Sequence, residues 1–125
     1  MKLQELFSAT RNVKVFPLSL GETDSDGYRQ PTPKVHCMDG TTLSVQVGSG
    51  LYCIPRDNNG PYTHVEVGFP SRGFTQLTEY TDGGEGDDPT ESVYGYVPIE
   101  IVEEIIEECG GMCVEITLLK VEKHG

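Results

Sequence analysis

Acidic side chains are the residues of this chain whose number and spacing could do chemistry. Between Gly73 and Leu119 the sequence contains no lysine or arginine. The same stretch holds twelve of the 20 acidic residues, and it accounts for most of the formal net charge of −11 at pH 7. A field of one sign repels nucleic acid and membrane surfaces and attracts basic proteins or metal cations. The sequence therefore predicts a binding protein that makes no direct contact with nucleic acid or membrane.

Five of these acids belong to one predicted amphipathic helix, residues 98–109. Apolar residues recur there at helical spacing, and the glutamates fill the opposite side of the helix. Like charges four residues apart cost a few tenths of a kcal/mol per pair, so the glutamate side of this helix is not optimised for stability. It is either a docking surface for a basic protein, mimicking the phosphates of nucleic acid, or a solvated face of an acidic protein. The docking hypothesis names Glu100, Glu103, Glu104, Glu107 and Glu108.

A second candidate site is the segment 51–64, a predicted hairpin tip with a cation, an acid, two amides and two aromatic rings. A small polar ligand such as a nucleotide signal could stack on a tyrosine there and be anchored by the arginine, in a monomer or between subunits of a homo-oligomer. A nucleotide would also require the cations Arg29, Lys34, Arg56 and Arg72 to converge. The structural alternative is a well-built turn. This hypothesis names Tyr52, Arg56, Asp57, Asn58, Asn59 and Tyr62.

The cysteines allow a weaker hypothesis. Cys109 and Cys113 have a spacing that suits half of a zinc site, and the other half could come from Cys37, Cys53, His36 and His64. However, Cys109 belongs to the apolar face of the predicted helix, and free cysteine is among the most buried residue types. We therefore interpret the cysteines as reduced core thiols rather than as a metal site or a redox pair, and expect neither metal nor cofactor.

Catalysis has little support in the sequence. The chain lacks a nucleophile-elbow motif, a zinc-protease motif and a phosphate-binding glycine loop. Asp24 and Asp26 resemble the start of a calcium loop, but Val35 stands where the loop needs a bidentate glutamate. The carboxylates of segment 81–92 lie in a predicted exposed loop, where a pKa is not tuned for proton transfer. We expect no enzyme.

The elements that would position these residues follow from hydrophobic periodicity. Helical spacing predicts a short turn at 2–8 and the main helix at 98–109, with Pro98 first and Gly110 as the left-handed stop. Alternation predicts strands at 12–20, 35–38, 41–47, 51–54, 63–69 and 112–122, with a two-residue type I′ turn at Asp39-Gly40. In the strand at 63–69, the side chains of Val65, Val67 and Phe69 should share one face. The prediction is one α+β domain over 1–125: a small, mostly antiparallel sheet of four or five strands, the main helix on one face, and mobile loops near 21–33 and 81–92.

The stretches LYCIPRDNNGPYTHVEVGFPS (51–71) and VYGYVPIEIVEEIIEECGG (93–111) resemble small uncharacterised reading frames of bacteriophages and prophages. With VHCMDGTTLSVQVG, the resemblance covers about Val35 to Gly111. It implies a phage accessory protein in the bacterial cytoplasm, in keeping with the lack of an apolar signal core. We therefore expect a non-enzymatic inhibitor of a bacterial defence system, whose partner is a basic, nucleic-acid-binding effector. Sequestration of a signalling nucleotide and a virion or packaging role are the alternatives.

Overall fold

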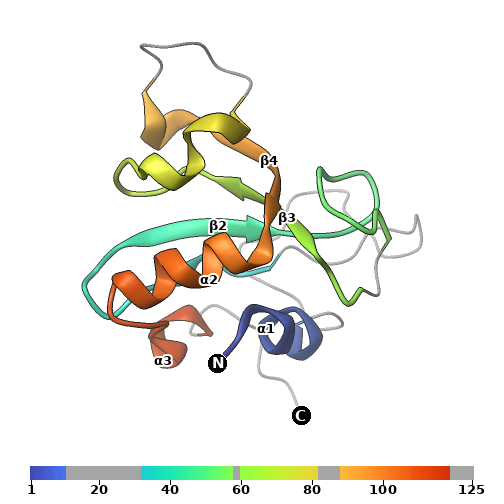
Figure 1. The fold of residues 1–125 in the computed structure, drawn as a ribbon. Coiled ribbons are helices and arrows are strands. Elements are labelled where there is room, and N and C mark those ends of the chain that lie inside the picture. Colours follow the sequence, from blue (N-terminus) through green and yellow to red (C-terminus); the bar gives the residue numbers. More distant parts are fainter. Residues whose placement is uncertain (11–31, 58–59, 82–87, 119–125) are drawn as a thin grey trace, which may run out of the picture.

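The computed structural model describes residues 1–10, 32–57, 60–81 and 88–118. Four strands form one antiparallel sheet in the order β1-β2-β3-β4, and helices α1 and α2 lie against it (Figure 1). This confirms the predicted α+β fold. The elements are α1 (Leu3–Thr10), β1 (Val35–His36), β2 (Thr42–Gln46), β3 (His64–Gly68), the 3-10 helices η2 (Thr75–Tyr80) and η3 (Pro89–Glu91), β4 (Val93–Pro98), α2 (Ile99–Glu108) and α3 (Val114–Thr117).

Alternating burial in the central strands places the core on one face of the sheet. In β2, Leu43 and Val45 are fully buried, whereas the residues that alternate with them, Thr42, Ser44 and Gln46, are partly exposed. In β3, Val65 and Val67 are also fully buried. Successive side chains of a strand point to opposite faces, so one face of the sheet is apolar and the other is polar. The alternation predicted for these strands is confirmed.

Helix α2 covers the apolar face. Its residues Val102, Ile105 and Ile106 are buried in the core, together with Leu3, Leu6 and Phe7 of α1. The helix begins one residue later than predicted, because Pro98 still has an extended backbone. It ends as predicted: Gly110 has a φ of 91°, its N–H donates to the Glu107 carbonyl at 3.0 Å, and the Gly111 N–H donates to the Ile106 carbonyl at 2.8 Å. This pair of hydrogen bonds is a Schellman stop.

The first hairpin has a longer loop than predicted. The Cys37 N–H donates to the Thr41 carbonyl at 2.8 Å, and the Gly40 N–H donates to the Cys37 carbonyl at 3.0 Å. Gly40 has a positive φ of 95°, but Asp39 does not. A type I′ turn needs positive φ at both central residues, so the prediction of a two-residue turn is wrong. The three residues between Cys37 and Thr41 form the loop, with the glycine in its left-handed position.

The second hairpin is also irregular. Residues 51–54 were predicted as a strand, but they make only an isolated bridge, between Ile54 and His64. Phe69 was predicted to share the buried face of Val65 and Val67, yet it is 53% exposed. Its φ of 49° breaks the strand alternation and turns the side chain outward. Both predictions are therefore wrong in detail, although β3 itself is confirmed.

The segment after α2 was predicted as a strand, and this prediction is wrong for its described part. Met112 makes a single bridge to Cys37, and the chain then forms the short helix α3. The His36 carbonyl accepts the Cys113 N–H at 2.7 Å, and the hydroxyl of Thr117 accepts the His36 N–H at 3.0 Å. Gly110 and Gly111 both have positive φ, which turns the chain back onto the free edge of β1.

The fourth strand of the sheet comes instead from β4, which the periodicity did not indicate. Its burial pattern does not alternate, and its register on β3 shifts between Val65 and Val67. The predicted strand at 12–20, most of the loop at 21–33, residues 82–87 of the acidic loop and residues 119–122 lie outside the described residues.

We predict that the two faces of α2 respond oppositely to mutation. Ile105→Ala removes a fully buried side chain and should lower the free energy of unfolding by about 2–5 kcal/mol. Glu107→Gln relieves like-charge repulsion on the exposed face and should be neutral or slightly stabilising. Urea denaturation followed by circular dichroism measures both. A larger loss for Glu107→Gln than for Ile105→Ala would contradict the orientation of the helix.

Candidate docking surfaces

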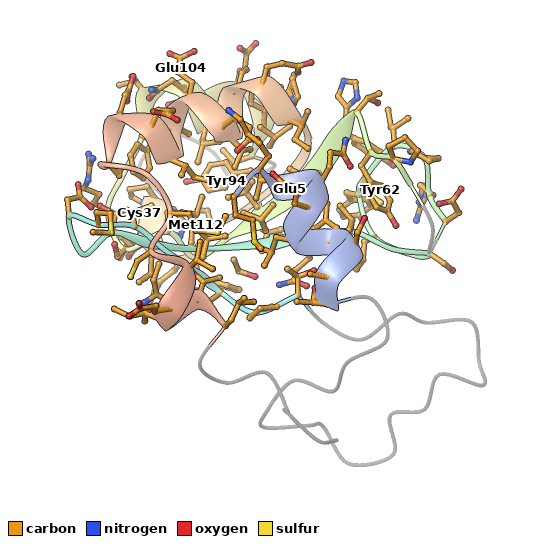
Figure 2. All side chains as sticks on the ribbon, turned by 90° about the horizontal axis from the view of Figure 1, so that it is seen from below. Glu5, Cys37, Tyr62, Tyr94, Glu104 and Met112 are labelled. Atoms are coloured by element: carbon orange, nitrogen blue, oxygen red, sulfur yellow. The ribbon has the colours of Figure 1, made fainter. Side chains whose placement is uncertain are left out.

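Four glutamates of α2 are exposed, and three of them, Glu100, Glu104 and Glu107, make no side-chain hydrogen bond to another element in the described part of the chain. They face outward because the opposite stripe of the helix is buried in the core. In Figure 2, Glu104 lies on the side of α2 that faces away from the sheet. Within the described part of the chain, none of the three forms an ion pair with a lysine or arginine. We call Glu100, Glu104 and Glu107 the acidic face.

The other two predicted glutamates of this helix take part in contacts with neighbouring elements. Glu103 is partly buried, and its Oε2 accepts the N–H of Leu3 at 3.3 Å. The contact places a carboxylate at the N-terminus of α1, where a negative charge is favourable. Glu108 Oε2 accepts a hydrogen bond from Gln76 Nε2 of η2 at 2.9 Å. The five predicted residues therefore divide into three on the acidic face and two that contact neighbouring elements, of which Glu103 is partly buried and Glu108 is exposed.

Tyr62 of the predicted hairpin tip is a core residue. It is 2% exposed, its ring meets the ring of Phe7 edge-on at 5.6 Å, and its hydroxyl donates to the Asp57 carbonyl at 2.9 Å. The side chain of Gln4 bonds both the N–H and the carbonyl of Tyr62. Helix α1 therefore covers this residue. The hypothesis that a ligand stacks on Tyr62 is wrong.

The rest of the tip matches the structural alternative of a well-built turn. Asp57 Oδ1 accepts the N–H of Gly60 at 2.9 Å, so this carboxylate shapes the turn. Asn58 and Asn59 lie outside the described residues. Arg56 is exposed, and its guanidinium carbon lies 5.9 Å from the ring centroid of Tyr52. Of the four predicted residues that the structure describes here, Tyr52 and Arg56 are the pair whose side chains meet at the surface.

The structure adds Tyr96, which the sequence analysis missed. Tyr96 is 39% exposed and Tyr52 is 48% exposed, and their ring centroids are 5.7 Å apart. The Tyr96 N–H donates to the Tyr52 carbonyl at 3.0 Å. The signal that could have found this pair is Gly95, because an isolated glycine within a strand indicates a bulge or a close approach.

The cations that a nucleotide would require are held by different partners. Arg72 lies 4.3 Å above the ring of Phe74, and its Nη2 donates to Cys109 Sγ at 3.3 Å. Arg56 instead contacts Tyr52. Lys34 is exposed, and Arg29 lies outside the described residues. Because Arg56 and Arg72 do not share a contact, the structure does not favour a site for an anionic nucleotide.

The thiols are part of the core. Cys37, Cys53 and Cys109 are buried, and Cys113 is partly buried. Burial, reinforced by the neighbouring Cys109 thiol and the Asp39 carboxylate, raises the pKa of Cys37 to about 12. Burial also raises the pKa of Cys53. Among the residues with described positions, no group of three or more histidine, cysteine, aspartate or glutamate side chains could hold a metal ion.

Comparison with known proteins gives no relative from which a function could be carried over: no family model, no curated protein and no solved structure matches the chain. In the described part of the chain, no helix combines the length and apolar character that crossing a membrane would need.

We predict that Glu103 stabilises the fold whereas Glu104 does not. Glu103→Ala removes the acceptor of the Leu3 N–H and should lower the free energy of unfolding by about 0.5–1.5 kcal/mol more than Glu104→Ala does. The two substitutions make the same change in helix propensity and charge, so their difference isolates the contact with α1. Equal stabilities in thermal and urea denaturation would show that the contact contributes nothing.

We predict that Cys113 is the thiol that reacts first in the folded protein. It is partly exposed, whereas Cys37, Cys53 and Cys109 are buried and the raised pKa of Cys37 keeps it a thiol well above pH 7. Ellman's reagent at pH 8 should modify about one thiol per chain quickly and the others only after unfolding. Cys113→Ser should remove the fast phase. A fast phase that survives in this variant would contradict the assignment.

Proposed function

We propose that this protein is a non-enzymatic binding protein that docks its acidic face on the basic surface of another protein. The observation that carries the proposal is the exposure of Glu100, Glu104 and Glu107 without a neutralising cation. All three are exposed on one side of α2, and no cation among the described residues neutralises them. Like-charged pairs at this spacing weaken a helix, so the arrangement reduces stability and leaves a strong surface charge.

The charge density of this face supports a partner that normally binds nucleic acid. An α-helix rises 1.5 Å per residue, so the three carboxylates follow one another along the helix axis at intervals of about 6 Å and about 4.5 Å, a mean of about 5 Å. One strand of DNA carries about one phosphate per 3.4 Å of axis. A groove that attracts a phosphate backbone would therefore meet a line of negative charge on α2 that is about two-thirds as dense as one DNA strand.

The described residues give catalysis less support than binding. A hydroxyl–imidazole contact of 2.9 Å joins Thr63 to His64, which are neighbours in sequence and lie at the surface. Water reaches both groups. The contact therefore lacks the preorganised site, closed to water, in which a base activates a hydroxyl as a nucleophile. The thiol of Cys37 is buried, and its pKa of about 12 disfavours the reactive thiolate.

The resemblance to phage reading frames suggests the biological setting of such a surface. A phage protein made in the bacterial cytoplasm meets the nucleases and other nucleic-acid-binding effectors of the host defence. We therefore propose that the partner is an effector of this kind, and that the acidic face inhibits it by occupying its nucleic-acid groove. Long-range attraction would speed the encounter, and buried contacts would set the lifetime of the complex.

We predict that neutralising the acidic face weakens partner binding without unfolding the protein. Glu100→Gln, Glu104→Gln and Glu107→Gln, combined in one variant, should lower the association rate for a partner captured from the bacterial host. The difference from the wild type should shrink between about 0.05 M and about 0.3 M salt, because exposed charges are screened within about 8 Å at physiological ionic strength. Surface plasmon resonance gives the rates.

A matched control changes the net charge equally at other exposed sites: Glu79→Gln, Glu91→Gln and Glu115→Gln. Neither variant includes Glu103, because that residue contacts α1. The proposal expects the control to lose clearly less binding than the acidic-face variant. Equal losses would show that only the overall charge matters, and the absence of any loss would show that the interface lies elsewhere.

A further inference from the structure

Two exposed aromatic residues have a backbone conformation that residues with a Cβ rarely adopt. Among the described residues other than glycine, a positive φ occurs at Phe69 (49°) and Tyr96 (52°). Both side chains are large and exposed. The left-handed region is unfavourable for such residues, and the positions that retain it cluster at functional sites. An exposed ring adds little core packing in return, so Tyr96 is a candidate for a role in binding.

The surroundings of Tyr96 fix its position. The register of β4 on β3 shifts between Val65 and Val67, and a bulge of this kind redirects a side chain. The Tyr96 N–H donates to the carbonyl of Tyr52 at 3.0 Å. At Gly95, an added Cβ would lie 3.1 Å from the Cβ of Tyr52, so the absence of a side chain there permits the close approach.

The result is a pair of rings in contact at the surface. The centroids of Tyr52 and Tyr96 are 5.7 Å apart, and the ring planes are tilted by 46°. About half of Tyr52 and over a third of Tyr96 are accessible to solvent. Tyrosine is enriched among the residues that dominate protein interfaces, because its ring provides a large contact area with few rotatable bonds.

The charges around the rings favour a cationic ligand over an anionic one. The backbone N–H of Tyr52 donates to Glu66 Oε1 at 3.4 Å, so a carboxylate lies at the backbone of one of the two tyrosines. The guanidinium of Arg56 already lies 5.9 Å from the centroid of Tyr52. Tyrosine rings attract cations through their negative faces, and the net charge of −11 attracts basic partners from a distance.

We propose that the rings of Tyr52 and Tyr96 form a second docking site, which binds an arginine or lysine side chain of a basic protein partner. Glu66 provides the neighbouring negative charge. Arg56 competes from within the chain for the ring of Tyr52. This site goes beyond the function proposed above, because it uses β4 and the loop before β3 rather than the outer face of α2.

The test titrates the isotope-labelled protein with a blocked tetra-arginine peptide and follows each backbone amide by NMR. A tetra-citrulline peptide, which has nearly the same shape but no charge, is the control. The arginine peptide should shift the amides of Tyr52, Gly95 and Tyr96, and the citrulline peptide should not. The same shifts should persist when Glu100, Glu104 and Glu107 are all changed to Gln, so a failure of the acidic face can be distinguished from a failure of this site.

Two substitutions make the test specific. Tyr96→Asn removes the ring, and asparagine tolerates the left-handed backbone, so the fold should persist while affinity at this site falls about two- to fivefold. Arg56→Ala removes the internal competitor and should strengthen peptide binding. The direction of this second effect shows whether the site prefers a cationic or an anionic ligand. A site for an anionic ligand would bind more weakly once Arg56, its positive anchor, is removed.

Three results would overturn the proposal. The first is an arginine peptide that leaves the three amides unshifted in the wild type. The second is an Arg56→Ala protein that binds the peptide more weakly than the wild type. The third is adenosine monophosphate shifting these amides more strongly than the arginine peptide, which would assign the rings to a nucleotide. Should Tyr96→Asn fail to fold, Tyr52→Leu removes the other ring and replaces it in the comparison.

Discussion

The packing of α2 on the apolar face of the sheet is the interaction on which the rest of the structure depends. Burying an aliphatic side chain contributes about 1.5–3 kcal/mol, whereas each like-charged pair on the outer side of the helix costs a few tenths. Val102, Ile105 and Ile106 therefore outweigh the repulsion among the glutamates and fix the rotation of the helix about its axis. Once that rotation is fixed, Glu100, Glu104 and Glu107 must face solvent. The core and the acidic face are thus two consequences of one apolar stripe.

The contacts at the ends of α2 and along the sheet edges determine which surfaces remain exposed. Beyond α2, the chain folds back so that Met112 bridges Cys37 and the α3 segment bonds the backbone of β1. On the other side, Thr81 bridges Tyr94 of β4. Covered edges protect a sheet from pairing with other chains. Side chains that remain exposed to a partner include the carboxylates on the outer face of α2, the ring of Tyr96 on β4 and the ring of Tyr52 in the loop before β3.

The sequence predicted the elements whose periodicity is strong and local. The apolar stripe of α2, its glycine stop and the alternation of β2 were all readable, because burial repeats at a fixed spacing there. Strand β4 was not readable, since its bulge breaks the alternation, and residues 112–118 were misassigned because a four-residue helix has too few turns to show its period. The negative charge of the candidate site could be predicted from the sequence, but not which individual residues are exposed there. Tyr62 is not available to a ligand because α1, which is distant in sequence, covers it. Glu103 is not part of the acidic face because its carboxylate contacts Leu3. Such long-range contacts leave no local pattern.

The central claim is that the outer face of α2 contacts a basic partner. Carbodiimide labelling of carboxylates, with and without a bound host partner and read out by peptide mass spectrometry, tests it most directly. The account predicts that Glu100, Glu104 and Glu107 react readily in the free protein and are protected in the complex, whereas Glu79, Glu91 and Glu115 react equally in both. Protection of the second group, or unchanged labelling of the first, would contradict the claim.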